Sequence, residues 1–558
     1  MIAFSAQFGF GITIRSGTML SLAGPGGALI IYAVSCFLGW ALMGPFVEMS
    51  SVIPATGPVW ELPALFIDTT LGGTLGYMFW FMYLVIYAEE VSVTARLFGF
   101  DYKGEPRLSW NRTKGVNSGI WALLTIITSC GVNVLPVRYY GELEYWFGYL
   151  KILGLVVIIA AQVPINLHGK VMDGPGSTGD RYWYNCRDSN CTNSTGFINR
   201  VFRIGEEPNL YTYSGPAAGL MAVWYACFYF THLLGCDRIE VSAYRTGVTY
   251  TTFSFISCAT ISIAAAEARH RGQDLKSANR KTLLRMTCLY MFGIFLVAFN
   301  VPYDHKQLLV FNSHRQLSGS RSPFVIAMAE AGFFRLAHVS NGFFIFATWA
   351  CATSNMYSAS RTLYSLALNQ YMPEFRGLRR KLATTTGRGV PLNSILACTL
   401  FGFLGFLSIG EKVRAQQALD GLSRIGTMFW IITFLGLSIT FIRYYHFLEG
   451  RAQASPQDPR VDREFGKVAA RQAAASGPIP NGAMQIGNTQ PPPLEIYAYK
   501  SHFQPYRSWV GILVTSLFII FNGWWVFAGR FQADDFVTCY IAVSSNVSWL
   551  IPSSTEIS

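Results

Sequence analysis

Apolar runs of about 18 to 25 residues recur along the whole chain, and each is long enough to cross a bilayer as a helix. Only 13% of the 558 residues are charged, about half the roughly 25% that is typical of soluble domains. This excludes a soluble enzyme, a secreted domain and a disordered scaffold. We predict an all-α, polytopic helical membrane protein. Its spans lie near residues 4–22, 28–52, 71–98, 117–134, 145–163, 216–266, 284–301, 336–364, 391–409, 422–442 and 507–528.

The sixth run is too long for one span, and a twelfth run at 534–552 is weak because Ser and Pro interrupt it. The chain begins inside its first run without a charged n-region, so we predict no signal peptide. The net charge of +12 fits basic cytoplasmic loops better than nucleic-acid binding, for which we find no motif. Eleven cysteines in a chain of this length do not indicate a disulfide framework.

Two signals orient the chain. The loops 267–285 and 376–388 are rich in Lys and Arg, which places them in the cytoplasm. Glycosylation sequons begin at Asn111, Asn190 and Asn193, in loops that the span count places on the opposite side. We therefore predict a cytoplasmic N-terminus, although basic residues in 99–118 run against this assignment.

Two further segments lie outside the spans. Cys186 and Cys191 share the loop after the fifth span and either form an extracellular disulfide or remain two free thiols. Residues 449–497 are rich in Ala, Gln, Gly and Pro, and we predict a disordered cytoplasmic loop there.

The first span contains Gly9-Phe10-Gly11 and Ser16-Gly17. Glycine inside a membrane helix indicates either close helix packing or a discontinuous helix whose freed N–H groups bind a carboxylate near the midplane. The residues alone leave both interpretations open.

The segment 9–17 resembles the first-helix motif of fungal amino-acid permeases, of the amino acid–polyamine–organocation superfamily. The similarity continues in order over residues 1 to 542. Further matching segments are Glu48-Met49 with Ile53-Pro54 and Gly57, Tyr139 to Trp146 followed by Lys151, Phe253-Ser254-Phe255, Ala264 to Ala268, Ser358 to Ala367, and Tyr499 to Tyr506.

The resemblance implies twelve helices with two inverted five-helix repeats and a substrate held between broken first and sixth helices. Carboxylate binding is then expected at Gly9, Phe10, Gly11 and Ile12, while Phe255 and Ser257 supply the sixth-helix half. The resemblance also implies an L-amino acid as substrate, the bilayer as surroundings, no nucleic-acid partner, and no cofactor beyond a proton gradient. It leaves the oligomeric state open.

Three charged residues in or at the start of apolar runs are candidates for proton coupling. Lys151 lies inside an apolar run, where it either serves function or snorkels to the interface. The resemblance implies that its ammonium replaces a bound ion. Glu90 matches a family glutamate, whereas its neighbour Glu89 does not and is better explained by packing. Glu144 lies either on a proton path or at the helix start for electrostatic reasons.

The sequence departs from the family pattern at several positions. Phe10 replaces a small hydroxyl residue, Arg15 replaces glycine, and Ser257-Cys258-Ala259 replaces Gly-Thr-Glu. Residues 225–245 have no family counterpart, and codons at both ends can form splice sites in frame. We interpret them as a translated intron, with genuine divergence as the alternative. The tail 543–558 is unrelated to the family.

We predict a secondary transporter of L-amino acids in a fungal plasma membrane, coupled to protons. The alternatives are a sensor of the same fold and an inactive product of an incomplete gene model. An enzyme is not indicated, because we find neither a His-Glu metal motif nor a Gly-x-Ser-x-Gly elbow.

Overall fold

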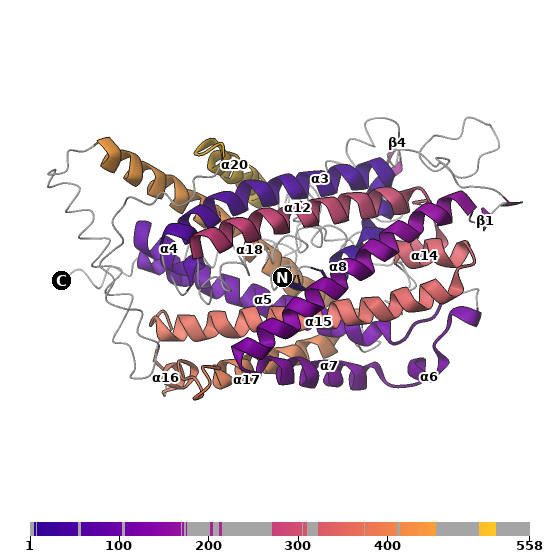
Figure 1. Ribbon diagram of the computed structural model, residues 1–558, viewed down its shortest axis with the longest axis horizontal. Coiled ribbons are helices and arrows are strands. Elements are labelled where there is room, and N and C mark those ends of the chain that lie inside the picture. The colour runs from indigo at the N-terminus through magenta and orange to yellow at the C-terminus, as the bar shows by residue number, and fades with distance from the viewer. Residues whose placement is uncertain are drawn as a thin grey trace.

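The computed structural model describes residues 5–6, 8–53, 57–102, 106–168, 170–171, 174–175, 201–204, 211–214, 271–303, 305–309, 322–372, 374–375, 377–409, 413–453 and 502–520. These form a bundle of long helices with the N-terminal segment near its centre (Figure 1). The long helices are α3 (Arg15–Val52), α5 (Thr69–Leu97), α7 (Ser118–Asn133), α8 (Val137–His168), α12 (Arg271–Ala298), α15 (Phe334–Leu368), α17 (Leu392–Phe401), α18 (Val413–Gln453) and α20 (Tyr506–Ile520).

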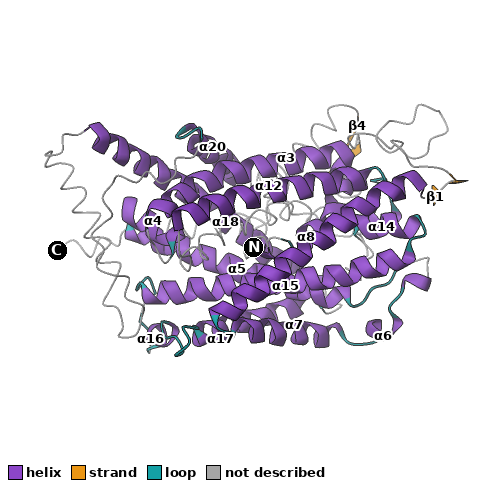
Figure 2. Cartoon of the chain, in the orientation of Figure 1, coloured by secondary structure: helices purple, strands orange, loops and turns teal. Residues whose placement is uncertain are grey.

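Short elements connect these helices (Figure 2). They are α2 (Phe10–Thr13), α4 (Pro58–Phe66), η1 (Pro106–Leu108), α6 (Asn111–Lys114), α13 (Lys306–Leu309), α14 (Pro323–Glu330), α16 (Leu378–Leu382) and η7 (Gly402–Ser408). Two small antiparallel pairs join β1 (Lys170–Val171) to β2 (Gly174–Pro175) and β3 (Val201–Ile204) to β4 (Tyr211–Ser214).

Most of the predicted spans coincide with helices where the structure describes them, and the first two spans are the exception. Five of the described helices are long and apolar enough to cross a membrane. A mostly helical membrane protein, the coarse form of the prediction, is therefore confirmed, with β1 to β4 as short additions. The sixth span, 216–266, and the twelfth, 534–552, lie outside the described residues.

The boundary between the first two spans differs from the prediction. No loop separates them, because α3 runs from Arg15 to Val52 with one turn at Gly24. Gly24 has φ 74°, a left-handed value that glycine adopts without a Cβ penalty. Pro25 follows directly and restarts the helix, as proline does at a first helical position.

Helix ends also extend beyond the apolar runs. α12 begins at Arg271, well before the predicted start at residue 284, because a helix continues from water into the bilayer while hydropathy marks only its apolar part. Similarly, α18 continues to Gln453, into the segment predicted to be disordered from residue 449. The rest of 449–497 lies outside the described residues.

The core is built around α5, which packs against α15, α18 and α4. Trp60 of α4 is fully buried and lies against Gly76 of α5, where a Cβ would approach the Trp60 Cβ to 3.1 Å. α3 and α12 lie side by side (Figure 1), and Tyr32 stacks on Tyr290 with ring centroids 5.8 Å apart. The N-terminal segment lies against α8 at Ser5, against α15 at Ala6 and against α5 at Gly9.

Candidate functional site

The first helix is interrupted where its glycines lie. Ser5 and Ala6 are helical, Phe8 and Gly9 form a bend, and α2 begins at Phe10. α2 ends at Thr13, and α3 begins after Ile14. The interruption frees backbone groups in a buried setting, and such groups need partners.

Two other helices satisfy the freed carbonyls. The Nζ atom of Lys151, from α8, donates to the Ser5 carbonyl at 2.7 Å. The Sγ atom of Cys351, from α15, donates to the Ala6 carbonyl at 2.9 Å. Lys151 is 0% exposed, so its ammonium does not reach the surface. The break in the first helix is thereby tied to α8 and α15.

Gly9 allows the close approach of two side chains. A Cβ at this position would overlap Oε1 of Glu90 and lie 2.7 Å from Sγ of Cys351. Glu90 belongs to α5 and is buried. Lys151 interacts electrostatically with both Glu90 and Glu144. The charged candidates from the sequence are therefore brought to one region.

Glu144 lies on α8 seven positions before Lys151, about two helical turns, and is 0% exposed. Its Oε1 atom accepts a hydrogen bond from the Ser354 hydroxyl at 2.7 Å and from the Tyr140 hydroxyl at 3.0 Å. Two hydroxyl donors stabilise a carboxylate away from water.

Glu89 and Glu90 are neighbours in sequence but face different helices. Glu90 lies at Gly9, whereas Glu89 accepts a hydrogen bond from the hydroxyl of Ser423 on α18. The two carboxylates therefore do not form a pair at one site. The Ser423 contact agrees with the packing role that the sequence favours for Glu89.

Sequence reasoning missed the contribution of α15. Cys351, Ser354 and Asn355 are all buried and face the site, with Asn355 donating to the Cys351 sulfur at 3.3 Å. The available signal is the density of small polar residues inside an apolar run, since such residues in a span are commonly functional or bind other helices.

The remaining predicted residues divide into two groups. The first group forms the start of α2: Gly9 lies in the bend before it, and Phe10, Gly11 and Ile12 are its first three residues. Phe255, Ser257, Asn190, Asn193, Cys186 and Cys191 lie outside the described residues. Their predicted roles stay predictions.

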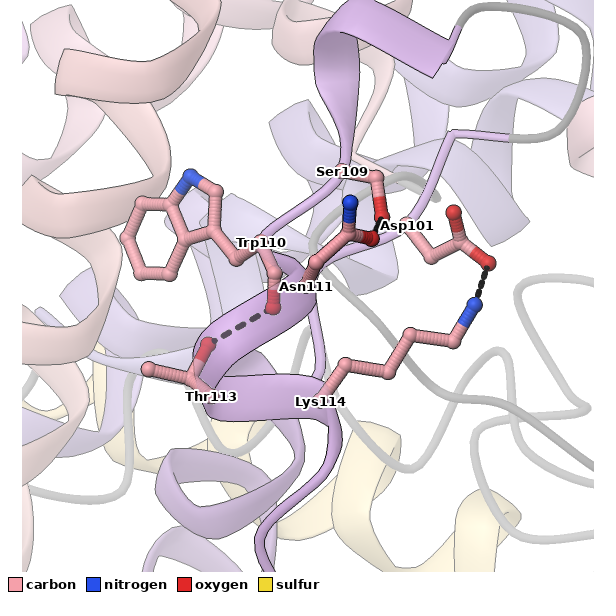
Figure 3. A network of polar contacts seen from close by, with 6 residues as sticks. All are labelled: Asp101, Ser109, Trp110, Asn111, Thr113 and Lys114. Carbon is pink, nitrogen blue, oxygen red and sulfur yellow. Dashed lines mark hydrogen bonds and ion pairs between the residues drawn. The ribbon is translucent and has the colours of Figure 1, made fainter.

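Asn111 lies exposed on α6 (Figure 3). Its Oδ1 atom accepts from the Ser109 hydroxyl at 2.9 Å, and Lys114 forms an ion pair with Asp101 at 2.5 Å. The hydroxyl of Thr113, the third sequon residue, donates to the Phe98 carbonyl at 2.6 Å. The side-chain amide of Asn111 is thus at the surface, on a short helix that the Thr113 and Lys114 contacts fix to the preceding residues.

A second polar cluster joins the same loop to α14. The Glu330 carboxylate accepts from the Tyr102 hydroxyl at 2.5 Å and lies 3.4 Å from Nε2 of His305. The His305 hydrogen bond holds the pKa of Glu330 below its ordinary value; partial burial opposes this, and the Tyr102 bond adds to it. Within the described part of the chain, no three His, Cys, Asp or Glu side chains are arranged to hold a metal ion.

Comparison with known proteins gives one family. Residues 1–453 match the family model described as amino acid permease. A proline-specific permease of Emericella nidulans is 25% identical, covering 97% of this chain and 80% of the relative. A basic amino-acid permease of Saccharomyces cerevisiae is also 25% identical, covering 97% and 77%. A manganese transporter of Eremococcus coleocola aligns over 98% of this chain and 91% of its own with 12% identity and a TM-score of 0.42.

Proposed function

Because the chain belongs to the amino acid permease family, we propose that it imports an L-amino acid across a fungal plasma membrane by proton symport. Family membership makes it an integral membrane transporter with an amino acid as its small-molecule substrate. The choice of membrane, the substrate and the coupling ion are parts of the proposal.

The observation that carries the proposal is the bond from Lys151 to the Ser5 carbonyl. Discontinuous helices in transporters expose N–H groups and carbonyls that bind substrates and ions near the midplane. Here the Lys151 ammonium binds a freed carbonyl, a kind of group that binds cations in such transporters. Its position supports a role for Lys151 in place of an ion.

The substrate carboxylate is assigned to the N–H groups at the start of α2, from Gly9 to Ile12. α2 is only four residues long, so its backbone groups have few partners of their own. Phe255 and Ser257 complete the site from the sixth helix in this proposal. Phe10 supplies no hydroxyl, so the α2 backbone acts alone.

Proton coupling is assigned to Lys151, Glu90 and Glu144. All three are buried, and Lys151 lies within electrostatic reach of both carboxylates. A proton that moves between Lys151 and the carboxylates would change the hold of α8 on the first helix, since a neutral amine binds a carbonyl more weakly. Substrate binding at the break and the charge on Lys151 would then be linked.

The experiment is uptake of labelled amino acids by yeast that lacks its own permeases, at acidic and neutral external pH. The matched pair is Lys151→Gln, at the site, and Lys381→Gln, an exposed lysine of α16. We expect Lys151→Gln to abolish accumulation and its stimulation by acid, while Lys381→Gln behaves as the unchanged chain. Normal acid-stimulated uptake by Lys151→Gln would exclude the proposed coupling role.

The same assay addresses residues 225–245, which lie outside the described residues. A chain without them is compared with the full chain. Uptake only by the shortened chain supports the proposed intron. Substrate binding without accumulation by either form, at normal surface expression, would favour a sensor over a transporter.

A further inference from the structure

α8 and α15 are joined by a ladder of polar and aromatic contacts. Going from Lys151 toward the start of α8, successive α8 residues contact α15 residues of increasing number. Lys151 lies near Cys351, Glu144 binds Ser354, and Tyr140 stacks on Tyr357. The two helices are therefore antiparallel, and the ladder leads from the break in the first helix toward the start of α8.

The last rung of this ladder is a closed aromatic contact. The Tyr140 and Tyr357 rings are 4.5 Å apart at their centroids and inclined by only 8°. Each side chain is at most 2% exposed. The Tyr140 hydroxyl donates to Glu144 on the inner side, and the Arg361 guanidinium carbon lies 5.1 Å from the Tyr357 ring centroid.

The stack lies at a definite depth relative to Lys151. Lys151 lies eleven positions after Tyr140 on α8, about 16 Å at 1.5 Å per residue, and their partners Cys351 and Tyr357 lie six positions apart on α15, about 9 Å. Half of a hydrocarbon core is about 15 Å. If Lys151 acts near the midplane, a rung about 9 to 16 Å away lies in the half of the membrane that the start of α8 faces, which the basic loops identify as the cytoplasmic half.

We infer that the stacked pair Tyr140–Tyr357 is the cytosolic gate of the Lys151 site. This inference rests on the proposed function for its orientation and for the role of Lys151. Two stacked, buried rings block the way from the cytosol to Glu144 and Lys151, so the rings must separate before either group meets the cytosol. Glu144 positions the Tyr140 ring by accepting the hydrogen bond that the Tyr140 hydroxyl donates.

Arg361 acts on the other ring. A guanidinium over an aromatic face is attracted by the ring quadrupole, and Arg361 is one helical turn beyond Tyr357 on α15. This contact stabilises the closed position of Tyr357 from the cytosolic side. Removing the charge is expected to favour separation without removing either ring.

The test uses Cys351 as a native reporter, because it is buried beside Ala6 behind the stack. Inside-out vesicles are treated with 2-(trimethylammonium)ethyl methanethiosulfonate, whose permanent charge keeps it from crossing the membrane, and modification of Cys351 is measured by mass spectrometry of its peptide. The variants are Tyr357→Ala, Tyr357→Phe, Arg361→Gln and Tyr145→Ala. Tyr145 is a matched control, since it lies on α8 but is 46% exposed.

We expect Tyr357→Ala to speed modification at least tenfold, and Arg361→Gln to speed it by a smaller factor. Tyr357→Phe keeps the ring, and Tyr145→Ala lies away from the stack, so both should match the unchanged chain. Equal rates in Tyr357→Ala and Tyr357→Phe overturn the gate. If Tyr357→Ala does not fold, the rate of Cys351 modification in Arg361→Gln decides instead: a rate equal to that of the unchanged chain overturns the gate.

The orientation and the proposed function are checked separately. Faster modification in right-side-out vesicles alone overturns the cytosolic assignment. Labelling requires no transport, so it reports on the gate even if uptake by the unchanged chain is absent, which would count against the proposed function alone.

Discussion

At the scale of single residues, Gly9 determines how closely the first helix approaches its neighbours. The absence of a Cβ lets Glu90 and Cys351 lie directly against the bend. Glycine in a helix interior otherwise costs about 1 kcal/mol relative to alanine. Gly9 lies in the bend before α2, where that cost does not arise, and the missing Cβ permits a contact that a larger residue would prevent.

We therefore expect Gly9→Ala to reduce uptake at least tenfold and to destabilise the protein by about 1–3 kcal/mol, the usual effect of overpacking. The matched control is Gly131→Ala on α7, where an added Cβ meets nothing within 4 Å. Uptake and thermal unfolding of the purified variants measure both effects. Equal uptake by the two variants would contradict the assigned role of the bend.

Glu330 predicts a pH dependence outside the membrane. Its pKa is lowered by His305 and Tyr102, so the folded state favours the ionised form. The resulting stability is complete above the ordinary glutamate pKa of about 4.3 and is lost as the pH falls through the lowered pKa.

Glu330→Gln should accordingly lower the unfolding temperature at pH 7, and the difference from the unchanged chain should vanish in strong acid. Tyr102→Phe removes one hydrogen-bond donor to the same carboxylate and should also lower the unfolding temperature at pH 7, by a smaller amount. Thermal unfolding from pH 3 to pH 8 measures this. A difference that grows on acidification would show that the sign is wrong.

At the scale of elements, helix starts depend on single capping residues. Asp68 precedes α5 with extended backbone angles, and its carboxylate accepts the Thr70 N–H at 2.8 Å. This bond replaces one of the partners that the first helical N–H groups lack. α5 is the central helix of the bundle, so its start affects α4, α15 and α18 together.

Asp68→Ala is expected to destabilise the protein by about 1 kcal/mol, the usual cost of losing an N-cap. Asp68→Asn retains an oxygen acceptor and should cost only a few tenths. Chemical unfolding of both variants, followed by circular dichroism, gives the comparison. Equal losses for both would assign the effect to the charge instead of the cap.

The length of the apolar runs and the position of charges within them predict most of the helices and two of the buried charged residues. The apolar runs predict most helices, and Lys151 and Glu144 stand out because charges inside such runs are rare. The partners Cys351 and Ser354 do not stand out, since small polar residues are ordinary in packed membrane helices. α4 escapes prediction because its nine residues are too few for a span. The turn at Gly24 depends on one backbone angle that hydropathy does not report.

At the scale of the whole molecule, every functional assignment depends on which end of the bundle faces the cytosol. Asn111 and the basic residues of α16 lie at opposite ends of α15: Trp110, beside Asn111, donates to His338 near the start of α15, whereas α16 follows its end. The two sites must therefore lie on opposite sides of the membrane if α15 spans it.

We expect one glycan at Asn111, which Asn111→Gln removes, as seen by a mobility shift after treatment with an endoglycosidase. A cysteine placed at Lys381 should react with an impermeant maleimide only after the cells are opened. Arg112→Gln, which leaves the sequon intact, should keep the glycan. Labelling of Lys381→Cys in intact cells would invert the bundle, and the Tyr140–Tyr357 stack would then face the outside. The acid stimulation proposed for Lys151 would then require protons to enter through that stack, so topology and the pH dependence of uptake must agree for either to stand.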